Sequence, residues 1–379
     1  MKTLILAFFA LLSNTTMLPH NSRLKNNSVA KITEEQYDGP FVQYTGDKVL
    51  VNYINEDNGT KTVKTETIPL QQKDQLSLKV MTDIPGKYFQ VALKKKLQNE
   101  KCEFSKPANL FILSDIEGNF GALRKLLVAN KIINEDFKWK FDNGHLVLIG
   151  DFFDRGQQVT ELLWFIYSLE EKAKADGGYV HFILGNHEIM NLSADLRYVN
   201  KKYLENAGLL NQNYVSLYDE NSELGRWLRT KNIVEKIGDI LFTHGGISNE
   251  INNLNLSIAD INKLARPYYA DTTFNYSNPN SDILFSDLGP FWYRGYYKKN
   301  NPDIPIQIEN TLSQYRVKHI ITGHSIVSDT ISVWYNGKLL NTDVPHAAGR
   351  SEALLIENDK WYRTNPEGQK VLLMQKKKR

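Results

Sequence analysis

From residue 107 onward, apolar runs of strand length alternate with helical patterns, and this alternation restricts the fold more than any other feature of the chain. Residues 121–129 and 159–174 carry apolar side chains at helical spacing between such runs. Strands and helices that take turns in this way form α/β domains with a layered sheet. We therefore predict an α/β domain over residues 107–358. Its strand-length runs are 109–113, 145–149, 179–184, 239–243 and 319–322.

Each of the five runs is closely followed by a glycine-flanked acid, amide or histidine. In open α/β folds, sites assemble outside the carboxyl ends of the strands, so these side chains are expected to converge. Carboxylate and imidazole ligands together suit Mn, Fe or Zn, and they suit Mg less where two histidines bind. Two such cations offset the cost of burying carboxylates and, roughly 3.5–4 Å apart, activate a water against a phosphate ester. The five residues are Asp115, Asp151, Asn186, His244 and His324.

Taken singly, these segments are weak signals. Gly185-Asn-His-Glu188 is also compatible with a helix N-terminus, and Gly323-His324 with a hydrogen-bonded core histidine. Gly150-Asp-x-x-Asp-Arg-Gly156 is more specific, because it places two acids and an arginine directly behind an apolar run. The ordered set of five therefore supports the site, and no single segment does.

The same segments resemble a known family. Asp115-x-Glu117 and the four segments that follow it resemble the phosphoprotein phosphatase family of calcineurin-like metallophosphoesterases. Residues 186–192, 195–198 and 289–295 are similar to the bacterial Shewanella-like phosphatases, and the resemblance covers residues 107–356. It implies a calcineurin-like β-sandwich flanked by helices, with the metals at the strand ends.

The resemblance also implies metal ligands. Asp151 would bridge two divalent ions and Asp115 would hold the first of them. Asn186, His244 and His324 would hold the second ion.

Catalytic and substrate-binding roles follow from the same resemblance. His187 would be the general acid that protonates the leaving group, with Asp154 orienting its ring and favouring the charged form. Arg155 and Arg294 would grip the phosphoryl oxygens, with Asn186 also facing the substrate.

One position departs from the family, which has histidine where this chain has Glu117. Glutamate is a hard, anionic oxygen ligand. We expect Glu117 to coordinate the first ion and to favour Mn or Mg over Zn there. Two alternatives are that it binds through a water, leaving this site weak or empty, or that it supports a ligand without contacting metal.

The insert over residues 190–235 lies between the third and fourth segments and could form a lid. Arg197 or Arg226 in it would then contact the substrate, or either is an ion-paired surface arginine. Asp343 stands where related enzymes carry a structural acid, and no catalytic role is assigned to it.

The regions outside the α/β domain differ from it in composition and in hydrophobic pattern. Residues 1–19 contain a nine-residue apolar run of signal-peptide length, which predicts a periplasmic or secreted protein, with an uncleaved anchor as the alternative. Residues 37–104 hold short β-branched and aromatic runs separated by turns, which predict a small antiparallel β module that binds or packs. Residues 359–379 are a C-terminal extension ending in the solvated basic tail 376–379.

The overall charge limits the classes of binding partner that we expect. The formal net charge is only +3, with 23% charged residues, which favours neither nucleic acid nor stable membrane insertion after signal removal. The leading hypothesis is a two-metal phosphatase acting on a phosphorylated protein, at Ser/Thr or Tyr, or on a small phosphoester. The alternatives are a diadenosine polyphosphate or other phosphoanhydride hydrolase, and a non-catalytic binding protein with a degenerate metal site. The oligomeric state stays open.

Overall fold

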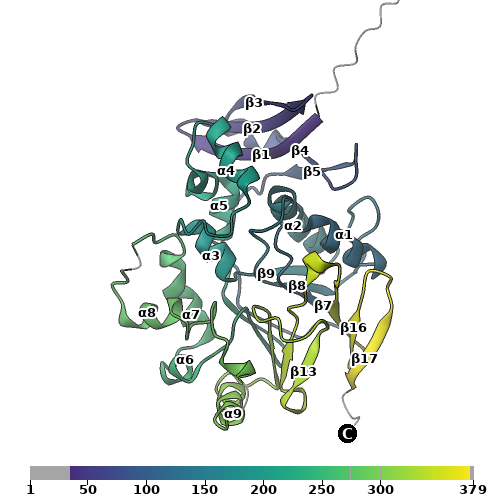
Figure 1. Ribbon diagram of the computed structural model, residues 1–379, viewed down its shortest axis with the longest axis vertical. Helices are drawn as coiled ribbons and strands as arrows, with labels where there is room; N and C mark the ends of the chain where they lie inside the picture. Colours follow the sequence, from purple (N-terminus) through teal and green to yellow (C-terminus); the bar gives the residue numbers. More distant parts are fainter. Residues whose placement is uncertain (1–34, 274, 299–300, 376–379) are drawn as a thin grey trace, which may run out of the picture. The chain divides into compact units, whose positions relative to one another are not determined.

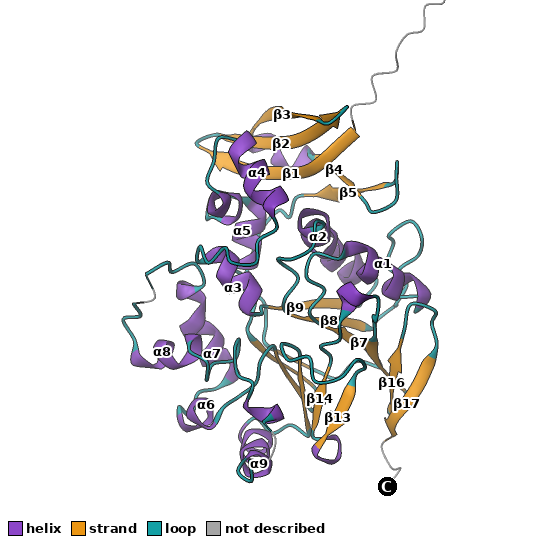
Figure 2. Ribbon diagram, in the orientation of Figure 1, coloured by secondary structure: helices purple, strands orange, loops and turns teal. Residues whose placement is uncertain are grey.

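Two six-stranded sheets form the centre of the protein (Figures 1 and 2). The computed structural model describes residues 35–273, 275–298 and 301–375. The expected signal peptide and basic tail therefore lie outside the described residues. One sheet runs in the order β17 (Lys370–Gln375), β16 (Lys360–Thr364), β15 (Ala353–Glu357), β7 (Asn109–Leu113), β8 (His145–Ile149), β9 (Tyr179–Ile183). The other runs in the order β13 (Ser332–Trp334), β14 (Leu339–Asn341), β12 (His319–Thr322), β11 (Ile240–Thr243), β10 (Val234–Ile237), β6 (Glu103–Phe104).

Alternating side chains of the strands explain why the sheets pack face to face. Leu110 and Ile112 of β7 point into a closed apolar cluster with residues of the second sheet such as Phe242 and Ile321. Phe111 of β7 points the other way, into the cluster shared with the helices. A strand with both faces buried is mostly apolar, as the parallel β7, β8 and β9 are; the buried exception is His181 of β9, which pairs with Glu235 at 2.7 Å. The β-sandwich flanked by helices is thus confirmed.

Helices α1 and α2 connect the parallel strands β7, β8 and β9, and α6 to α9 lie in the long connection between β11 and β12. In Figure 1, α1 and α2 lie over the sheet that contains β7, β8 and β9, while α6 to α9 lie toward the second sheet. None of the helices in the described part of the chain is long and apolar enough to cross a membrane. The helices are α1 (Phe120–Ala129), α2 (Val159–Ala175), α3 (Asn186–Leu192), α4 (Lys201–Leu209), α5 (Glu223–Leu228), α6 (Asn249–Asn253), α7 (Ile258–Ala265), α8 (Pro279–Phe285) and α9 (Ile304–Gln314).

The expected antiparallel β module is present at the N-terminal end. It consists of a three-stranded sheet and a separate hairpin. It packs on the helices: the Trp164 indole of α2 donates to the carbonyl of Pro40 at 2.8 Å, and the Tyr44 hydroxyl donates to Glu223 of α5 at 2.5 Å. One strand of the hairpin, β4, was not expected from the sequence. The strands are β1 (Glu35–Thr45), β2 (Lys48–Asp57), β3 (Thr60–Pro69), β4 (Ser77–Met81) and β5 (Tyr88–Ala92).

Two expected domain boundaries need correction. The β module was placed at residues 37–104, but β6 at its end pairs in parallel with β10 and so belongs to the sandwich. The main domain was ended at residue 358, but β16 and β17 extend the sheet next to β15. Both segments lie at sheet edges, where a short strand satisfies its backbone hydrogen bonds only by joining an existing sheet.

A buried ionic network joins the segment after β5 to α2. Glu170 accepts hydrogen bonds from Lys94 at 2.7 Å and from Lys231 at 2.6 Å. The indole of Trp227 donates to the same carboxylate at 3.0 Å. The two lysines lower the pKa of Glu170 to about 2 despite its burial, so the pair of positive charges keeps this carboxylate ionised.

Candidate active site

The sandwich brings the five expected loop tips together at the carboxyl ends of the strands. Three ligand atoms, one each from Asp151 after β8, His244 after β11 and His324 after β12, lie within 4.8 Å of one another. The Asp151 carboxylate is 3.0 Å from His244 Nε2, and the Asn186 side-chain oxygen is 3.1 Å from the same nitrogen. All four side chains are buried. Three strand ends and the first residue of α3 therefore meet at one point.

Backbone carbonyls orient both histidines for metal binding. His244 Nδ1 lies 2.7 Å from the carbonyl of Ile149, and His324 Nε2 lies 3.1 Å from the carbonyl of Trp292. A carbonyl only accepts, so each of these two nitrogens donates to its carbonyl, which leaves His244 Nε2 and His324 Nδ1 as the nitrogens that a metal would use. A metal ion at these nitrogens takes the place of any proton that they carry.

Asp115 and Asp343 are two further buried carboxylates near Asp151. The Asp115 carboxylate accepts the backbone N–H of His324 at 3.1 Å, which links the ends of β7 and β12. Burial and the negative Asp343 raise the pKa of Asp115 well above its usual range. Burial and the negative Asp151 and Glu117 do the same to the pKa of Asp343. The site therefore holds more buried carboxylates than its own cations neutralise, as expected where divalent cations bind.

Glu117 faces the same centre and is paired. One oxygen of its carboxylate, one of Asp151 and a ring nitrogen of His187 lie within 4.8 Å of one another. The Glu117 carboxylate also forms an ion pair with the guanidinium of Arg155. The structure thus places Glu117 where direct coordination is geometrically possible and gives it a protein partner as well.

His187 has the arrangement of a general acid. Its Nδ1 lies 2.6 Å from the carboxylate of Asp154, and its Nε2 is 3.7 Å from Asp151. Burial lowers the pKa of His187, but the negative Asp151 and Asp154 override this effect and raise it to about 9. The ring is therefore an imidazolium near neutral pH, with Nε2–H pointing into the site. The expected pairing of His187 with Asp154 is present.

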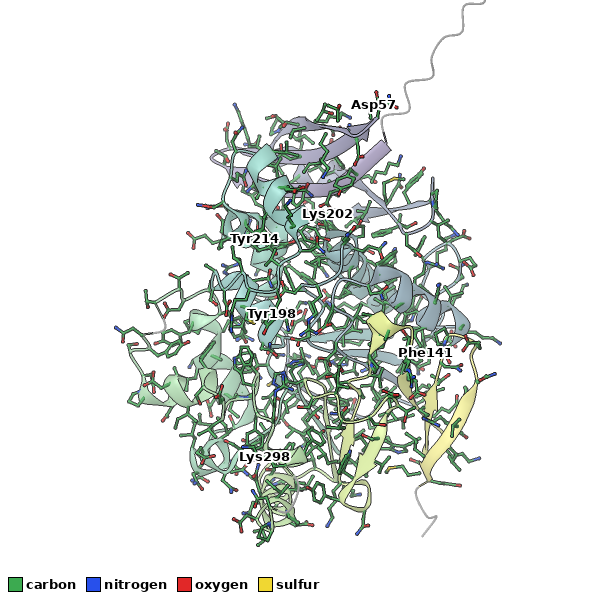
Figure 3. The ribbon with its side chains drawn as sticks, in the orientation of Figure 1. Asp57, Phe141, Tyr198, Lys202, Tyr214 and Lys298 are labelled. Carbon is green, nitrogen blue, oxygen red and sulfur yellow. The ribbon has the colours of Figure 1, made fainter. Side chains whose placement is uncertain are left out.

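Two residues that support this pair were not expected from the sequence. Asn191 donates to Asp154 at 2.8 Å, and the hydroxyl of Tyr214 donates to Asn191 at 2.5 Å. Tyr214, labelled in Figure 3, lies in the insert and packs beside α3. Asn191 lies one turn after His187 on α3, so its i+4 spacing was the available signal.

Glu188 is the third residue that sequence reasoning left without a role. Its buried carboxylate accepts the backbone N–H groups of Asp151 at 2.8 Å, Phe152 at 2.7 Å and Gly185 at 2.7 Å. One side chain therefore ties the loop after β8 to the start of α3. A carboxylate three residues after a helix N-cap commonly reaches back in this way, which was the signal for it.

The loops have an unusual backbone. Six non-glycine residues of the site have positive φ angles, a conformation that persists only where surrounding contacts enforce it. Gly150 also has a positive φ, and a Cβ there would lie 2.5 Å from the backbone of Gly185. Such concentrated strain is typical of functional sites. The six residues are Asp115, Glu117, Asp151, Asp154, Arg155 and His324.

The candidate phosphate-binding arginines lie at the rim. Arg294 donates to the carbonyl of His324 and to Ser325 at 3.1 Å. Arg155 lies with its guanidinium 5.5 Å from the ring centre of Tyr198, and this ring is 5.2 Å from the ring of His187. Tyr198 is 43% exposed, in the loop after α3 (Figure 3).

The two arginines of the insert differ. Arg197 pairs with Asp195 at 2.6 Å and lies 5.7 Å from the ring centre of Tyr198, close to the site. Arg226 lies 4.7 Å from the ring centre of Tyr44 in the β module. Arg226 therefore packs on the module, and only Arg197 is near the substrate rim.

Residues 108–328, more than half of the chain, match the calcineurin-like phosphoesterase family. The chain belongs to this family. The crystal structure of a cold-active protein-tyrosine phosphatase from a psychrophilic Shewanella species is 34% identical, with a TM-score of 0.79. That similarity covers 89% of this chain and 99% of the other. The resemblance to Shewanella-like phosphatases is thereby confirmed.

Curated relatives match over shorter stretches. Shewanella-like protein phosphatase 1 of Plasmodium berghei is 32% identical over 231 residues, which is 57% of this chain and 60% of the relative. The symmetrical bis(5'-nucleosyl)-tetraphosphatase of Legionella pneumophila is 31% identical over 140 residues, which is 36% of this chain and 44% of the relative. This chain thus matches less than two thirds of the length of either relative.

The donor set fits the divalent metals that this family binds. Two imidazoles oriented by backbone carbonyls, the amide oxygen of Asn186 and the carboxylate of Asp151 are a mixed nitrogen and oxygen set suited to first-row cations. Asp115 and Glu117 add carboxylate oxygens near Asp151, and oxygen ligands suit harder ions. These residues therefore fit metal binding.

Proposed function

We propose that this protein is a phosphatase that uses two divalent ions to hydrolyse phosphomonoesters on phosphorylated proteins. The observation that carries the proposal is the charged His187–Asp154 pair pointing at Asp151, the same carboxylate that lies among the ligand atoms of His244 and His324. A proton donor beside a metal-ligand cluster suits cleavage of an ester whose leaving oxygen needs a proton.

Each chemical task of this reaction has a residue in this chain. Divalent ions, when bound, supply Lewis-acid activation of water and neutralise phosphoryl charge. Arg155 and Arg294 present guanidinium groups for the phosphoryl oxygens, and the side-chain oxygen of Asn186 lies 3.1 Å from His244 Nε2. His187 donates the Nε2 proton to the leaving oxygen, and Asp154 holds the resulting ring in place at Nδ1. A non-catalytic binding protein would have no use for this proton donor.

The substrate we propose is an aryl phosphate, as in phosphotyrosine. Tyr198 is the exposed aromatic surface beside His187, so the group attached to the leaving oxygen would lie against its ring. Aromatic pairs contribute roughly 0.5–1.5 kcal/mol beyond area burial. The similar Shewanella enzyme is a protein-tyrosine phosphatase, which supports the same choice.

Hydrolysis of matched phosphopeptides tests this proposal. Metal-stripped protein is reloaded with Mn²⁺ and assayed with phosphotyrosine and phosphoserine peptides of one sequence, alongside diadenosine tetraphosphate. Tyr198→Ala should lower kcat/KM for phosphotyrosine by about tenfold while leaving phosphoserine nearly unchanged, since about 1.4 kcal/mol of stacking is lost. Tyr198→Phe is the control and should retain the preference. Turnover of the dinucleotide alone would overturn the proposal in favour of a phosphoanhydride hydrolase.

Two further proposals concern the identity of the metals and the cellular location of the enzyme. We propose Mn, Fe or Zn at the histidine-containing site, and Mn or Mg at the site that includes Glu117. Elemental analysis of protein purified from its natural compartment tests this assignment. We also propose a periplasmic or secreted enzyme because of the apolar run within residues 1–19, and recovery of activity in the cytoplasmic fraction would contradict it.

A further inference from the structure

Glu117 is the residue where this chain departs from the family, and its carboxylate has two competing uses. It pairs with Arg155, and one of its oxygens lies within 4.8 Å of ligand atoms of Asp151 and His187. Arg155 is also a candidate group for binding the phosphoryl oxygens. We propose that Glu117 is a positioning residue that holds Arg155 when no metal is bound beside it and releases Arg155 to the phosphoryl group when it coordinates metal.

Backbone contacts fix both ends of the pair, so only side-chain rotation can exchange the partners. The Glu117 N–H donates to the carbonyl of Asp151 at 2.9 Å, and its carbonyl accepts from Gly156 at 3.0 Å. The Arg155 N–H donates to the carbonyl of Tyr198 at 3.0 Å. The side chain of Arg155 is 50% exposed, whereas that of Glu117 is only 15% exposed. Arg155 is therefore the partner that is free to leave.

The charge around Glu117 gives the exchange its driving force. The carboxylates of Asp115, Asp151 and Asp343 interact electrostatically with one another within the same buried site, and Asp343 interacts with Glu117 as well. Arg155 neutralises Glu117 while the site contains only protein groups. A divalent ion brings more charge to the same carboxylate, so ion and guanidinium compete for it. A histidine at this position would not hold an arginine in this way.

Because the metal ion and Arg155 compete for the Glu117 carboxylate, metal binding at Glu117 and anion binding at Arg155 are coupled. Removing the guanidinium must strengthen metal binding, and removing the carboxylate must free the guanidinium for an anion, since coupling is reciprocal. The inference rests on the proposed metal-dependent phosphatase function for its biological meaning. It is tested by binding alone, so it can succeed or fail whether or not the Mn²⁺-loaded protein hydrolyses any phosphoester.

The first experiment is a calorimetric Mn²⁺ titration of metal-stripped protein. Arg155→Gln should bind Mn²⁺ about tenfold more tightly at one site, the size expected for release of a charge-assisted pair at a half-exposed position. Arg197→Gln is the matched control, because it removes the same charge from the same Tyr198 ring without touching Glu117, and should change affinity less than twofold. Unchanged or weaker Mn²⁺ binding by Arg155→Gln would overturn the proposal.

The second experiment measures inorganic phosphate binding without metal. Glu117→Gln should bind phosphate about tenfold more tightly than wild type because Arg155 is freed. Asp195→Asn is the matched control, since it removes one negative charge and frees Arg197 instead. The gain should vanish in Glu117→Gln/Arg155→Gln. An equal gain in phosphate affinity in Glu117→Gln and Asp195→Asn would show a general charge effect and refute the specific release of Arg155. A gain that persists in the double variant would refute it as well. If Arg155→Gln does not fold, the comparison of Glu117→Gln with Asp195→Asn still decides the question.

Discussion

Replacing Asp154 by asparagine tests the general acid most directly. Asp154 accepts from His187 Nδ1 at 2.6 Å inside a buried site, and the negative Asp151 and Asp154 together hold the pKa of His187 at about 9. An unperturbed histidine has a pKa of about 6.5, so the site raises it by about 2.5. A charge-assisted buried hydrogen bond contributes roughly 1.5–3 kcal/mol, which corresponds to about one or two pKa units. Asp154→Asn should therefore lower the pKa of His187 toward neutrality.

The sign of the pH effect follows from the role of His187. A general acid must be protonated, and activity is lost as the pH rises through its pKa. In wild type this loss should begin near the raised pKa, and in Asp154→Asn it should begin about one to two units lower. Asn191 would donate to the new amide oxygen as it now does to Asp154, turning the amide nitrogen toward His187 Nδ1. The neutral ring that results is a far weaker acid.

The assay measures initial rates of the Mn²⁺-loaded enzyme as a function of pH, with two substrates that differ in their leaving group. For phosphoserine, whose alkoxide needs a proton, kcat should fall by about 10²–10³-fold. For 4-nitrophenyl phosphate, whose leaving group departs unprotonated, the loss should be much smaller. Bound Mn²⁺, measured in parallel, should not change. An unmoved alkaline limb, together with equal losses for both leaving groups, would refute the assignment of His187 as general acid.

Two further predictions follow from the metal ligands and the buried network. Asp151→Asn should lose turnover and metal together, while His187→Asn should lose turnover with metals retained; equal metal loss, by elemental analysis, would contradict this division of roles. Lys231→Met should lower the free energy of unfolding by about 3–5 kcal/mol, because Glu170 keeps only Lys94 as an ionic partner. The pKa of Glu170 is depressed to about 2, so the ionised carboxylate stabilises the folded state above its usual pKa, and this stabilisation is lost as the pH falls toward 2. In urea titrations at neutral and acid pH, the free energy of unfolding should therefore fall less with acid in Lys231→Met than in wild type.

The strand-end pattern determined most of the site. Asp151 follows β8 of one sheet and reaches the two histidines of the other sheet only because the sheets pack face to face. His244 and His324 follow β11 and β12, neighbouring parallel strands of one sheet, so local sequence and sheet geometry bring these two together. The pairing of His187 with Asp154 could be expected for the same reason, because both residues lie just beyond adjacent strands. The backbone contacts of Glu188 also follow from its position at the start of a helix.

Other features depend on partners that the local sequence does not specify. β15 lies between β16 and β7, so residues near position 355 had to find residues near position 111 before the sheet could extend. The C-terminal strands were missed although β17 contains the apolar run 371–374, because a short edge strand gives little signal without the sheet that it joins. β4 was missed although Leu78 and Val80 alternate as buried residues, because a five-residue hairpin strand gives little signal without its partner.

Glu117 shows the same division at one residue. The sequence determined that a carboxylate replaces the family's histidine at the metal edge. Only the tertiary structure decided that this carboxylate reaches Arg155, since the two residues lie 38 positions apart on separate loops. Pattern and spacing fix which chemical groups reach the strand ends. Which charge each group faces there depends on side-chain packing, because electrostatic pairing is set by distances of a few ångströms that spacing along the chain does not encode.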